Sequence, residues 1–303
     1  MPILVVGSVA FDSIKTPSGS VERCVGGAAT YFSLAASYFT DVQILAVVGD
    51  DFTAEHESIM VKRGVDITAI QRKPGKTFFW SGEYAENLNE AKSLDTQLNV
   101  FADFDPVVPG RFQETPYLFL ANIQPALQLS VRNQMKDVQL TGADTMNYWI
   151  NGYRSELEKT LQKVDILLIN DTETRMLGGS SSLTRAAQNV LKLGPTALVV
   201  KHGEFGATAF FRADGMHPFR APALPIEEVV DPTGAGDCFA GGFMGYIASQ
   251  PEMNREVLKR AMFYGGVMGS FACEKFGTER FQTLTRRDID SRFEVFRELS
   301  HLE

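Results

Sequence analysis

The sequence predicts a three-layer α/β/α fold with a mostly parallel central sheet and a small β-sheet lid, in a single domain that spans residues 1–303. The main sheet is predicted because short runs of aliphatic residues alternate with longer amphipathic stretches, an order typical of parallel strands covered by helices. The lid is predicted because two turn-flanked segments interrupt this rhythm. In such folds, ligands bind at the carboxyl ends of the strands.

The strands of the main sheet are expected where short, mostly apolar runs occur: Ile3–Val6, Gln43–Val48, Leu118–Ala121, Ile166–Ile169 and Ala197–Lys201. Helices are expected where apolar residues recur at helical spacing: Ala28–Tyr38, Phe52–Arg63, Pro125–Lys136, Tyr153–Lys163, Leu183–Leu193 and Cys238–Ala248. The charged stretch from Arg286 to Glu303 is expected to form an amphipathic helix at the end of the chain.

The lid is expected to consist of approximately residues 13–25 and 76–104. In the first segment, two short extended runs flank the turn-rich tetrapeptide Pro17-Ser18-Gly19-Ser20, which predicts a hairpin. In the second, Thr77–Tyr84 and Leu98–Phe104 alternate aromatic and polar residues, as half-exposed strands do. These aromatic side chains fit two interpretations, ordinary packing or the floor of a lid over a flat substrate ring.

Composition excludes several classes of protein. The 303 residues carry 29 basic and 37 acidic side chains, and this acidic balance argues against nucleic-acid binding, which needs clustered Lys and Arg. No segment approaches the roughly 18 apolar residues of a membrane span. The amino terminus lacks the pattern of a secretory leader, and three scattered cysteines indicate neither a disulfide framework nor a zinc site. We therefore expect a cytoplasmic enzyme.

The most informative motif is DPTGAGDCFAGGFMG, at residues 231–245. Small residues just before a helix let backbone N–H groups converge on a ligand, and the helix amino terminus adds about half a positive charge. This arrangement suits a phosphoryl group in transfer, and Asp237 is the type of group that accepts a proton from an attacking hydroxyl. The tetrapeptide Gly-Ala-Gly-Asp alone would also fit an ordinary helix start with an acidic first turn.

The helix that follows contains Gly241, Gly242 and Gly245. Each interior glycine costs roughly 0.5–1 kcal/mol relative to alanine, so three of them need a structural reason. We expect that they leave one face bare for very close packing on the sheet. Cys238 adjoins Asp237 at the helix start, a position that could lower the pKa of its thiol, although a small helix residue is the simpler interpretation.

The whole string resembles the second signature of the pfkB carbohydrate kinase family, the ribokinase-like, ATP-dependent kinases of sugars and nucleosides. Four other segments resemble the family in the expected order, so the resemblance spans nearly the full chain: VGSVAFD at residues 6–12, GGAAT at 26–30, NDTE at 170–173 and KHGEFG at 201–206. The resemblance implies a ribokinase-like fold and the cofactors ATP and Mg²⁺. The family usually carries Asn where this chain has Thr30.

The resemblance also implies a role for each matching residue. The implied catalytic residues are the base Asp237 and an anion hole formed by Gly234, Ala235 and Gly236. The implied substrate-binding residues are Asp12, Gly26, Gly27 and Thr30, and the implied cofactor-binding residues are Asn170, Glu173, Lys201, Gly203, Gly206 and Gly277. Glu173 would act on Mg²⁺ indirectly, because this ion usually keeps several of its waters. Asp231 and Thr233 would border a monovalent-cation (K⁺) site opposite residues 272–277.

The expected reaction is transfer of the γ-phosphoryl group of ATP to a hydroxyl, often a hydroxymethyl in this family, of a sugar or sugar-like substrate. One alternative is a nucleoside kinase of the same fold. Another is a sugar- or nucleotide-binding regulator without catalysis, against which Asp237 argues, since a pure binder has no use for a base. An exposed lid edge could also pair two copies into a homodimer.

Overall fold

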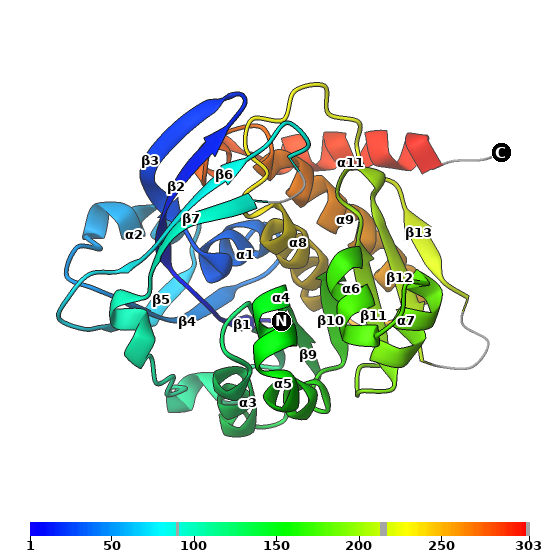
Figure 1. Ribbon diagram of the computed structural model, residues 1–303, viewed down its shortest axis with the longest axis horizontal. Helices are drawn as coiled ribbons and strands as arrows, with labels where there is room; N and C mark the ends of the chain where they lie inside the picture. The colour runs from blue at the N-terminus through cyan, green and yellow to red at the C-terminus, as the bar shows by residue number, and fades with distance from the viewer. Residues whose placement is uncertain (89–90, 213–216, 301–303) are drawn as a thin grey trace.

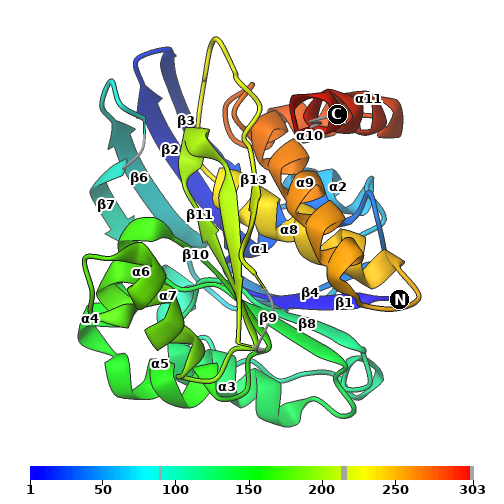
Figure 2. The same cartoon turned by 90° about the vertical axis from the view of Figure 1, so that its right-hand side faces the viewer.

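The computed structural model describes residues 1–88, 91–212 and 217–300, and Figures 1 and 2 show a large sheet between two layers of helices with a smaller sheet beside it. The predicted fold class is confirmed. Residues 301–303 of the expected terminal helix and residues 89–90 of the second lid segment lie outside the described residues. In the described part of the chain, no helix is long and apolar enough to cross a membrane.

Within the described residues, the main sheet has the strand order β13-β12-β11-β10-β9-β8-β1-β4-β5. All neighbours from β5 to β11 are parallel, whereas β12 pairs antiparallel with both β11 and β13. The strands are β1 Ile3–Val6, β4 Val42–Val48, β5 Asp66–Arg72, β8 Tyr117–Leu120, β9 Leu140–Ala143, β10 Ile166–Asn170, β11 Ala197–Lys201, β12 Ala207–Phe211 and β13 Phe219–Ala221. Each of the five predicted strands is confirmed to within one residue at either end.

Helices cover both faces of this sheet and bury alternate residues of its strands. One face is covered by α1 Ala28–Ala36, α2 Ala54–Val61, α8 Ala235–Ser249, α9 Arg255–Ala272, α10 Glu279–Thr283 and α11 Arg286–Ser300. The other is covered by α3 Pro125–Gln134, α4 Asn147–Gly152, α5 Arg154–Leu161, α6 Asp171–Gly178 and α7 Leu183–Leu191. All six predicted helices are present, with ends that differ by up to three residues.

The glycines of α8 do allow close packing, but the expected partner was wrong. A Cβ on Gly241 would lie 2.4 Å from the backbone oxygen of Phe32, and one on Gly242 would lie 2.6 Å from that of Tyr264. The bare surface of α8 therefore packs against the helices α1 and α9, not the sheet. Glycines within α9 meet it from the other side, and they obscured the helical pattern of α9 in the sequence.

The small sheet has the order β3-β2-β6-β7 and is made of β2 Ala10–Thr16, β3 Gly19–Gly26, β6 Phe78–Tyr84 and β7 Ala91–Gln97. The predicted hairpin and the strand at Thr77–Tyr84 are confirmed. The strand expected at Leu98–Phe104 was wrong: this segment contains the 3-10 helix η1 Asn99–Asp103. Its Phe101 stacks with Phe78 on one side and with Phe104 on the other. The fourth strand is instead β7, which is mostly polar and is exposed along its whole length.

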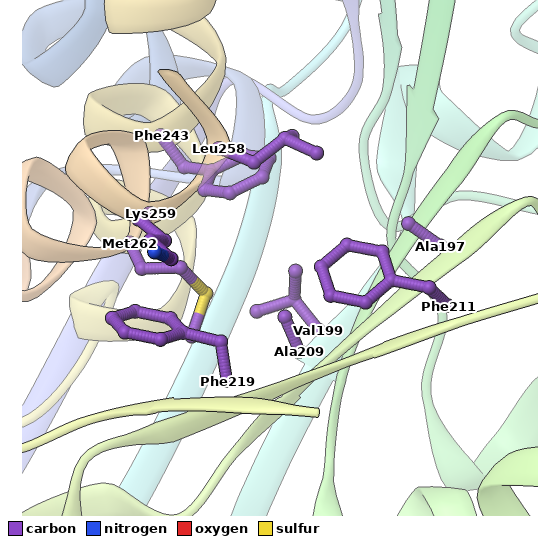
Figure 3. Close-up of a pocket in the computed structure, with 9 residues that line it drawn as sticks. All are labelled: Ala197, Val199, Ala209, Phe211, Phe219, Phe243, Leu258, Lys259 and Met262. Atoms are coloured by element: carbon purple, nitrogen blue, oxygen red, sulfur yellow. The ribbon is translucent and has the colours of Figure 1, made fainter. Parts of the chain in front are cut away.

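A small apolar gap of about 10 Å³ lies between strands β11–β13 and helices α8 and α9 (Figure 3). Its lining includes Phe211, Phe219 and Met262, and Lys259 is its one charged residue. An ordinary metabolite does not fit in so small a space. The gap is a packing irregularity at the edge of the sheet.

Candidate active site

The glycine-rich loop of residues 231–237 ends at the amino terminus of α8. Gly234 caps this helix with a φ of 74°, and a Cβ there would lie 2.4 Å from the ring of Tyr31. Both the left-handed backbone and the contact with the ring require glycine at this position. The loop therefore presents backbone, rather than side chains, at the start of α8.

The backbone donors of this loop differ from the predicted ones at Ala235. The N–H of Ala235 donates to the carbonyl of Pro232 at 3.1 Å, and the N–H of Cys238 donates to Gly234 at 2.8 Å. In the described part of the chain, the N–H groups of Gly236 and Asp237 have no backbone acceptor. Two adjacent donors at a helix amino terminus form a small site for an anion.

Lys201 brings a positive charge to the same site. A Cβ on Gly236 would lie 3.0 Å from its amino group, and this amino group forms an ion pair of 3.3 Å with Asp144. Burial alone would lower the pKa of Lys201, but the charges of Asp144, Glu173 and Asp237 outweigh burial and raise it. The lysine is therefore a permanent cation beside the two free N–H groups.

Asp237 lies in the first turn of α8 and is half-buried. Burial raises the pKa of its carboxyl to about 8, and the charge of Asp144 adds to this effect while Lys201 opposes it. The charges of Asp12 and Glu173 raise the pKa further. Three carboxyl groups, those of Asp144, Glu173 and Asp237, thus act on one lysine, and their excess negative charge favours a hard cation such as Mg²⁺ nearby.

The strand order explains why these residues meet. Asp144 directly follows β9, Asn170 ends β10 and Lys201 ends β11, and these three parallel strands are neighbours. Their carboxyl ends therefore lie at one edge of the sheet, where ligands bind in folds of this kind. The sequence analysis missed Asp144, since it follows the short, weakly apolar strand LTGA and carries no motif of its own.

Asn170 and Glu173 form a capping box at the start of α6. The Asn170 side chain accepts from the N–H of Glu173 at 2.7 Å, and the Glu173 carboxylate accepts from the N–H of Asn170 at 2.8 Å. The motif thus has a structural role, because it satisfies two free helix donors. Burial and the charge of Asp144 raise the pKa of Glu173 to about 7.

A groove of about 520 Å³ lies beside these residues. Three of the residues predicted to bind the cofactor, Asn170, Lys201 and Gly203, line it, together with Phe205 and Arg220. Gly203 begins the turn η3 Gly203–Phe205, which joins the antiparallel strands β11 and β12. Gly206 ends this turn with a φ of 91°, and a Cβ there would lie 2.1 Å from a backbone oxygen. Gly206 thus lets the chain enter β12 close to the backbone of β13, and it is not itself one of the lining residues.

The residues predicted to bind the acceptor form a second group. Asp12 lies on β2, is almost fully buried and packs against Gly26, where a Cβ would lie 1.9 Å from its carboxylate. Burial raises the pKa of Asp12 to about 7, although a hydrogen bond from Gly27 opposes the rise. Gly27 has a φ of 94° and caps α1, so the chain can turn closely around this acid.

Thr30 and Tyr31 follow on α1 and are fully buried. Among the described residues, the Thr30 hydroxyl has no hydrogen-bond partner, whereas the Tyr31 hydroxyl lies close enough to Asp12 to lower the pKa of that carboxyl. Burial raises the pKa of Tyr31 well above its usual value, and the charge of Asp12 adds to this effect, so the phenol is a neutral donor near the acid. Tyr31, whose ring also covers Gly234, was missed because a tyrosine in an apolar helix looks like ordinary core.

Asp231 organises the loop expected to border the cation site. Its carboxylate accepts from the N–H of Thr233 at 2.8 Å and from the N–H of Gly277 at 2.9 Å. The Thr233 hydroxyl donates to the Tyr84 hydroxyl at 3.1 Å, and Tyr84 belongs to the lid strand β6. The loop, the residues around 277 and the lid are therefore joined by hydrogen bonds through Asp231 and Thr233.

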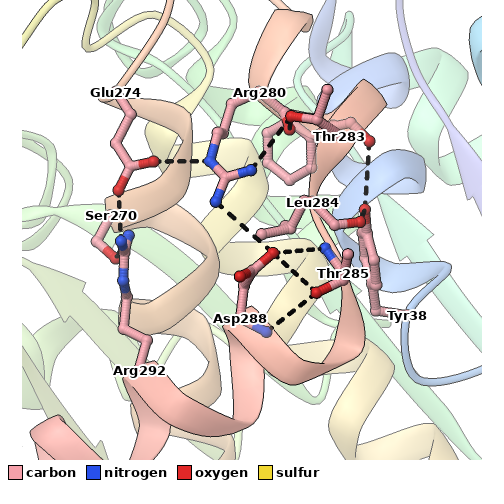
Figure 4. A network of polar contacts seen from close by, with 10 residues as sticks. Tyr38, Ser270, Glu274, Arg280, Thr283, Leu284, Thr285, Asp288 and Arg292 are labelled. Carbon is pink, nitrogen blue, oxygen red and sulfur yellow. Dashed lines mark hydrogen bonds and ion pairs between the residues drawn. The ribbon is translucent and has the colours of Figure 1, made fainter.

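The segment from 272 to 277 is braced from the outside by an ionic network (Figure 4). Glu274 pairs with Arg280 at 2.7 Å and also with Arg292 of α11. The guanidinium of Arg292 lies 3.5 Å from the ring centre of Phe271, which fixes its position further. This network holds the backbone carbonyls of the segment in place.

The structure rules out the lowered pKa that the position of Cys238 at a helix start could have produced. Its thiol is fully buried, and burial together with the charge of Asp237 raises its pKa well above the usual value. A protonated, inaccessible thiol is unreactive. The simpler interpretation of Cys238 as a small helix residue agrees with this burial.

Comparison of the whole chain with known proteins identifies the protein family that it resembles. The model of the family described as pfkB family carbohydrate kinase matches residues 3–284. The chain is 30% identical over 278 residues to a cytidine kinase of Thermococcus kodakarensis, and this match covers 86% of the chain and 97% of that enzyme.

Two solved structures show the same fold. One is the aminoimidazole riboside kinase of Salmonella enterica, complexed with aminoimidazole riboside and an ATP analog, at a TM-score of 0.76 and 16% identity. The match covers 97% of this chain and 100% of that one. The other is the fructokinase of Vibrio cholerae O395 with fructose, ADP and calcium bound, at a TM-score of 0.76 and 18% identity, covering 96% and 98% of the two chains.

Proposed function

The chain belongs to the pfkB family of carbohydrate kinases, and from this premise we propose the roles that its residues play in phosphoryl transfer. It is an ATP-dependent kinase of the class that phosphorylates sugars and nucleosides. The acceptor hydroxyl, a hydroxymethyl in our proposal, attacks the γ-phosphoryl group of ATP. ATP is found in the cytoplasm, and this is the compartment that we propose for the enzyme.

In this proposal Asp237 is the general base. Its carboxylate lies next to the two free N–H groups at the start of α8, so a phosphoryl group bound there would bring the attacking hydroxyl within its reach. A carboxylate cannot deprotonate an alcohol fully in the ground state, so the proton moves late, as the new P–O bond forms. Asp237 must be ionised to accept this proton, and the positive charge of Lys201 favours the ionised form by lowering the pKa.

Lys201 and the N–H groups of Gly236 and Asp237 stabilise the charge on the transferring oxygens. The groove lined by Asn170, Lys201 and Gly203 holds the nucleotide, and Gly206 ends the turn that carries Gly203. Gly277 instead lies against Cys24 of the lid and donates to Asp231. Mg²⁺, when bound with ATP, neutralises phosphate charge. Glu173 and Asp144 would hold its water shell, since in the described part of the chain no three His, Cys, Asp or Glu side chains can hold an ion alone.

The acceptor is held at Asp12, with the Gly26–Gly27 backbone around it. The unpartnered hydroxyl of Thr30 and the Tyr31 hydroxyl near Asp12 supply further polar contacts for acceptor hydroxyl groups. A neutral donor and an acid side by side suit a polyhydroxylated substrate, because each hydroxyl both donates and accepts.

One observation carries this proposal: the Asp237 carboxylate, the Lys201 amino group and two free backbone donors meet at one helix amino terminus. The direct test is ATP consumption with Mg²⁺ across a panel of sugars, polyols and nucleosides. We expect acceptor-dependent formation of ADP with at least one member. A protein that binds these ligands yet forms no ADP with any of them would instead be a non-catalytic binder.

We further propose that K⁺ activates the enzyme through the loop bordered by Asp231, Thr233 and residues 272–277. The bracing by Glu274 and Arg280 keeps the carbonyls of this loop in fixed positions, which favours binding of a weakly hydrated cation. Initial rates should be higher in KCl than in NaCl or choline chloride at equal ionic strength. Equal rates in all three salts would contradict the proposal.

The outer edge of the lid is the surface that we propose for a homodimer. All residues of β7 are exposed, Leu94 among them, and the far edge of this strand is unpaired in the described part of the lid. We expect a dimer by light scattering and a shift to monomer in Leu94→Lys. A wild-type protein that stays monomeric at every concentration tested would rule this surface out.

A further inference from the structure

The aromatic residues of the lid divide into two groups. Phe78 stacks with Phe101, Phe101 stacks with Phe104, and Phe79 packs against the main core, so these rings have structural partners. Trp80 and Tyr84 lie on the face of β6 that also carries Gly82, because alternate residues share a face. Tyr84 on this face reaches Thr233 of the glycine-rich loop. The face therefore points toward the candidate active site.

Trp80 lies directly beside the acceptor-binding acid. In the parallel pairing of β2 with β6, Asp12 is the partner of Trp80 and Ile14 is the partner of Gly82. Paired residues of neighbouring strands project to the same face of a sheet. Asp12, whose carboxylate influences the pKa of Asp237, and the indole of Trp80 thus stand on one surface.

Two neighbouring residues, Gly82 and Ser93, fix the position of the Trp80 indole. The six-membered ring of Trp80 lies over Gly82, where a Cβ would be 2.2 Å from it, so only glycine leaves room for the ring to lie against the sheet. Its N–H donates to the hydroxyl of Ser93 at 3.0 Å, which fixes its rotation. The side chain is only half-buried, and among the described residues no aromatic ring stacks on it.

A sugar ring bound at Asp12 would not reach the indole, because the indole lies further along β6. Its six-membered ring is over Gly82, two residues further along, which corresponds to about 6–7 Å. A monosaccharide held at Asp12 with a hydroxyl at Asp237 leaves this surface uncovered. An acceptor whose sugar bears a second, flat ring would cover it, and bases stack well on tryptophan.

We propose that Trp80 is the stacking platform for the base of a nucleoside acceptor, with the ribose hydroxyls bound at Asp12. This inference rests on the proposed kinase function and narrows its substrate class. It favours the nucleoside alternative over a free sugar. It also gives Gly82 and Ser93 a role, since they hold the indole flat.

Fluorescence gives a test that does not depend on turnover. The sequence has two tryptophans, and Trp149 belongs to α4, where its N–H donates to the side chain of Asn122. Trp149→Phe therefore leaves Trp80 as the only indole. Titration of this variant with uridine and with adenosine should quench the Trp80 emission for at least one of them. Ribose and fructose should leave it unchanged. Quenching by neither nucleoside would overturn the proposal.

Kinetics give the second test. Trp80→Ala should raise the KM for the nucleoside at least about tenfold, in line with the cost of losing one stacked base, and leave the KM for ATP unchanged. Trp80→Phe should recover part of this loss, and Trp149→Phe is the matched control. Efficient phosphorylation of free sugars but not of nucleosides would refute the inference and leave the kinase intact. Absence of ADP formation with every acceptor would refute the kinase function itself, while the fluorescence titration still decides the role of Trp80.

Discussion

Replacing Asp237 by Asn should lower kcat by at least about 10²-fold, because general-base catalysis typically contributes 10² to 10⁴ in rate. The amide keeps the shape of the side chain and both backbone donors, so ATP should still bind. The measurement is steady-state turnover with the best acceptor, together with an equilibrium titration of ATP. Asp41→Asn, at an exposed position, is the matched control. Near-normal turnover in Asp237→Asn would remove this residue from the proposed role.

We also expect Asp237→Asn to change the melting temperature of the protein. The pKa of Asp237 is raised to about 8, above the value of about 3.9 expected in the unfolded chain. The folded state therefore binds the proton more tightly, and this residue costs stability progressively as the pH rises from about 4 to 8. Asp237→Asn should thus melt at a higher temperature than the wild type at pH 8. A lower Tm would mean that loss of activity reflects misfolding instead of loss of the base.

Replacing Lys201 by Met should lower kcat/KM for ATP by about 10²-fold or more, the usual effect of removing one group that stabilises a developing anion. The amino group adjoins Gly236 and is the one cation that lowers the pKa of both Asp144 and Glu173. Steady-state kinetics with varied ATP measures the effect, and Lys192→Met, at an exposed position, is the control. A kcat/KM within a few-fold of the wild type would show that Lys201 does not contact the phosphates.

Measurements of Tm distinguish two roles of Lys201, stabilisation of the transferring phosphoryl group and neutralisation of the buried Asp144. Lys201→Met leaves Asp144 buried without its partner, so the Tm should fall, since breaking a buried ion pair is costly. Removing both charges in Lys201→Met/Asp144→Asn should restore most of the Tm but not the activity. If the double variant regained activity together with stability, Lys201 would serve only to neutralise Asp144.

The sequence predicted the strands of the main sheet that are continuous apolar runs and missed the others, β9 in its middle as well as β5, β12 and β13, for a physical reason. Strands buried on both faces are continuous apolar runs, as in Ile166–Asn170, and these are visible in the sequence. In the small sheet, the edge strand β7 is mostly polar and pairs with β6, and no local pattern reveals this pairing. The 3-10 helix at Asn99–Asp103 was mistaken for a strand because its spaced aromatic residues imitate alternation.

The residues of the candidate site likewise fall into those that a local sequence pattern reveals and those that only folding brings together. The glycine-rich loop and Asp237 are contiguous in the sequence, and their local geometry follows from the need for glycine at a left-handed helix cap. Asp144, Tyr31 and Trp80 enter the site only because distant strands and helices meet, and a lone acid or aromatic residue gives no signal of this. The raised pKa of Asp237 likewise depends on the burial and charge that folding creates.

A crystal structure with ADP, aluminium fluoride and an acceptor would test the central claim most directly. The fluoride should accept hydrogen bonds from the N–H groups of Gly236 and Asp237 and from Lys201, and the acceptor hydroxyl should lie within hydrogen-bonding distance of the Asp237 carboxylate. A fluoride bound elsewhere, or an acceptor hydroxyl out of reach of Asp237, would contradict the account.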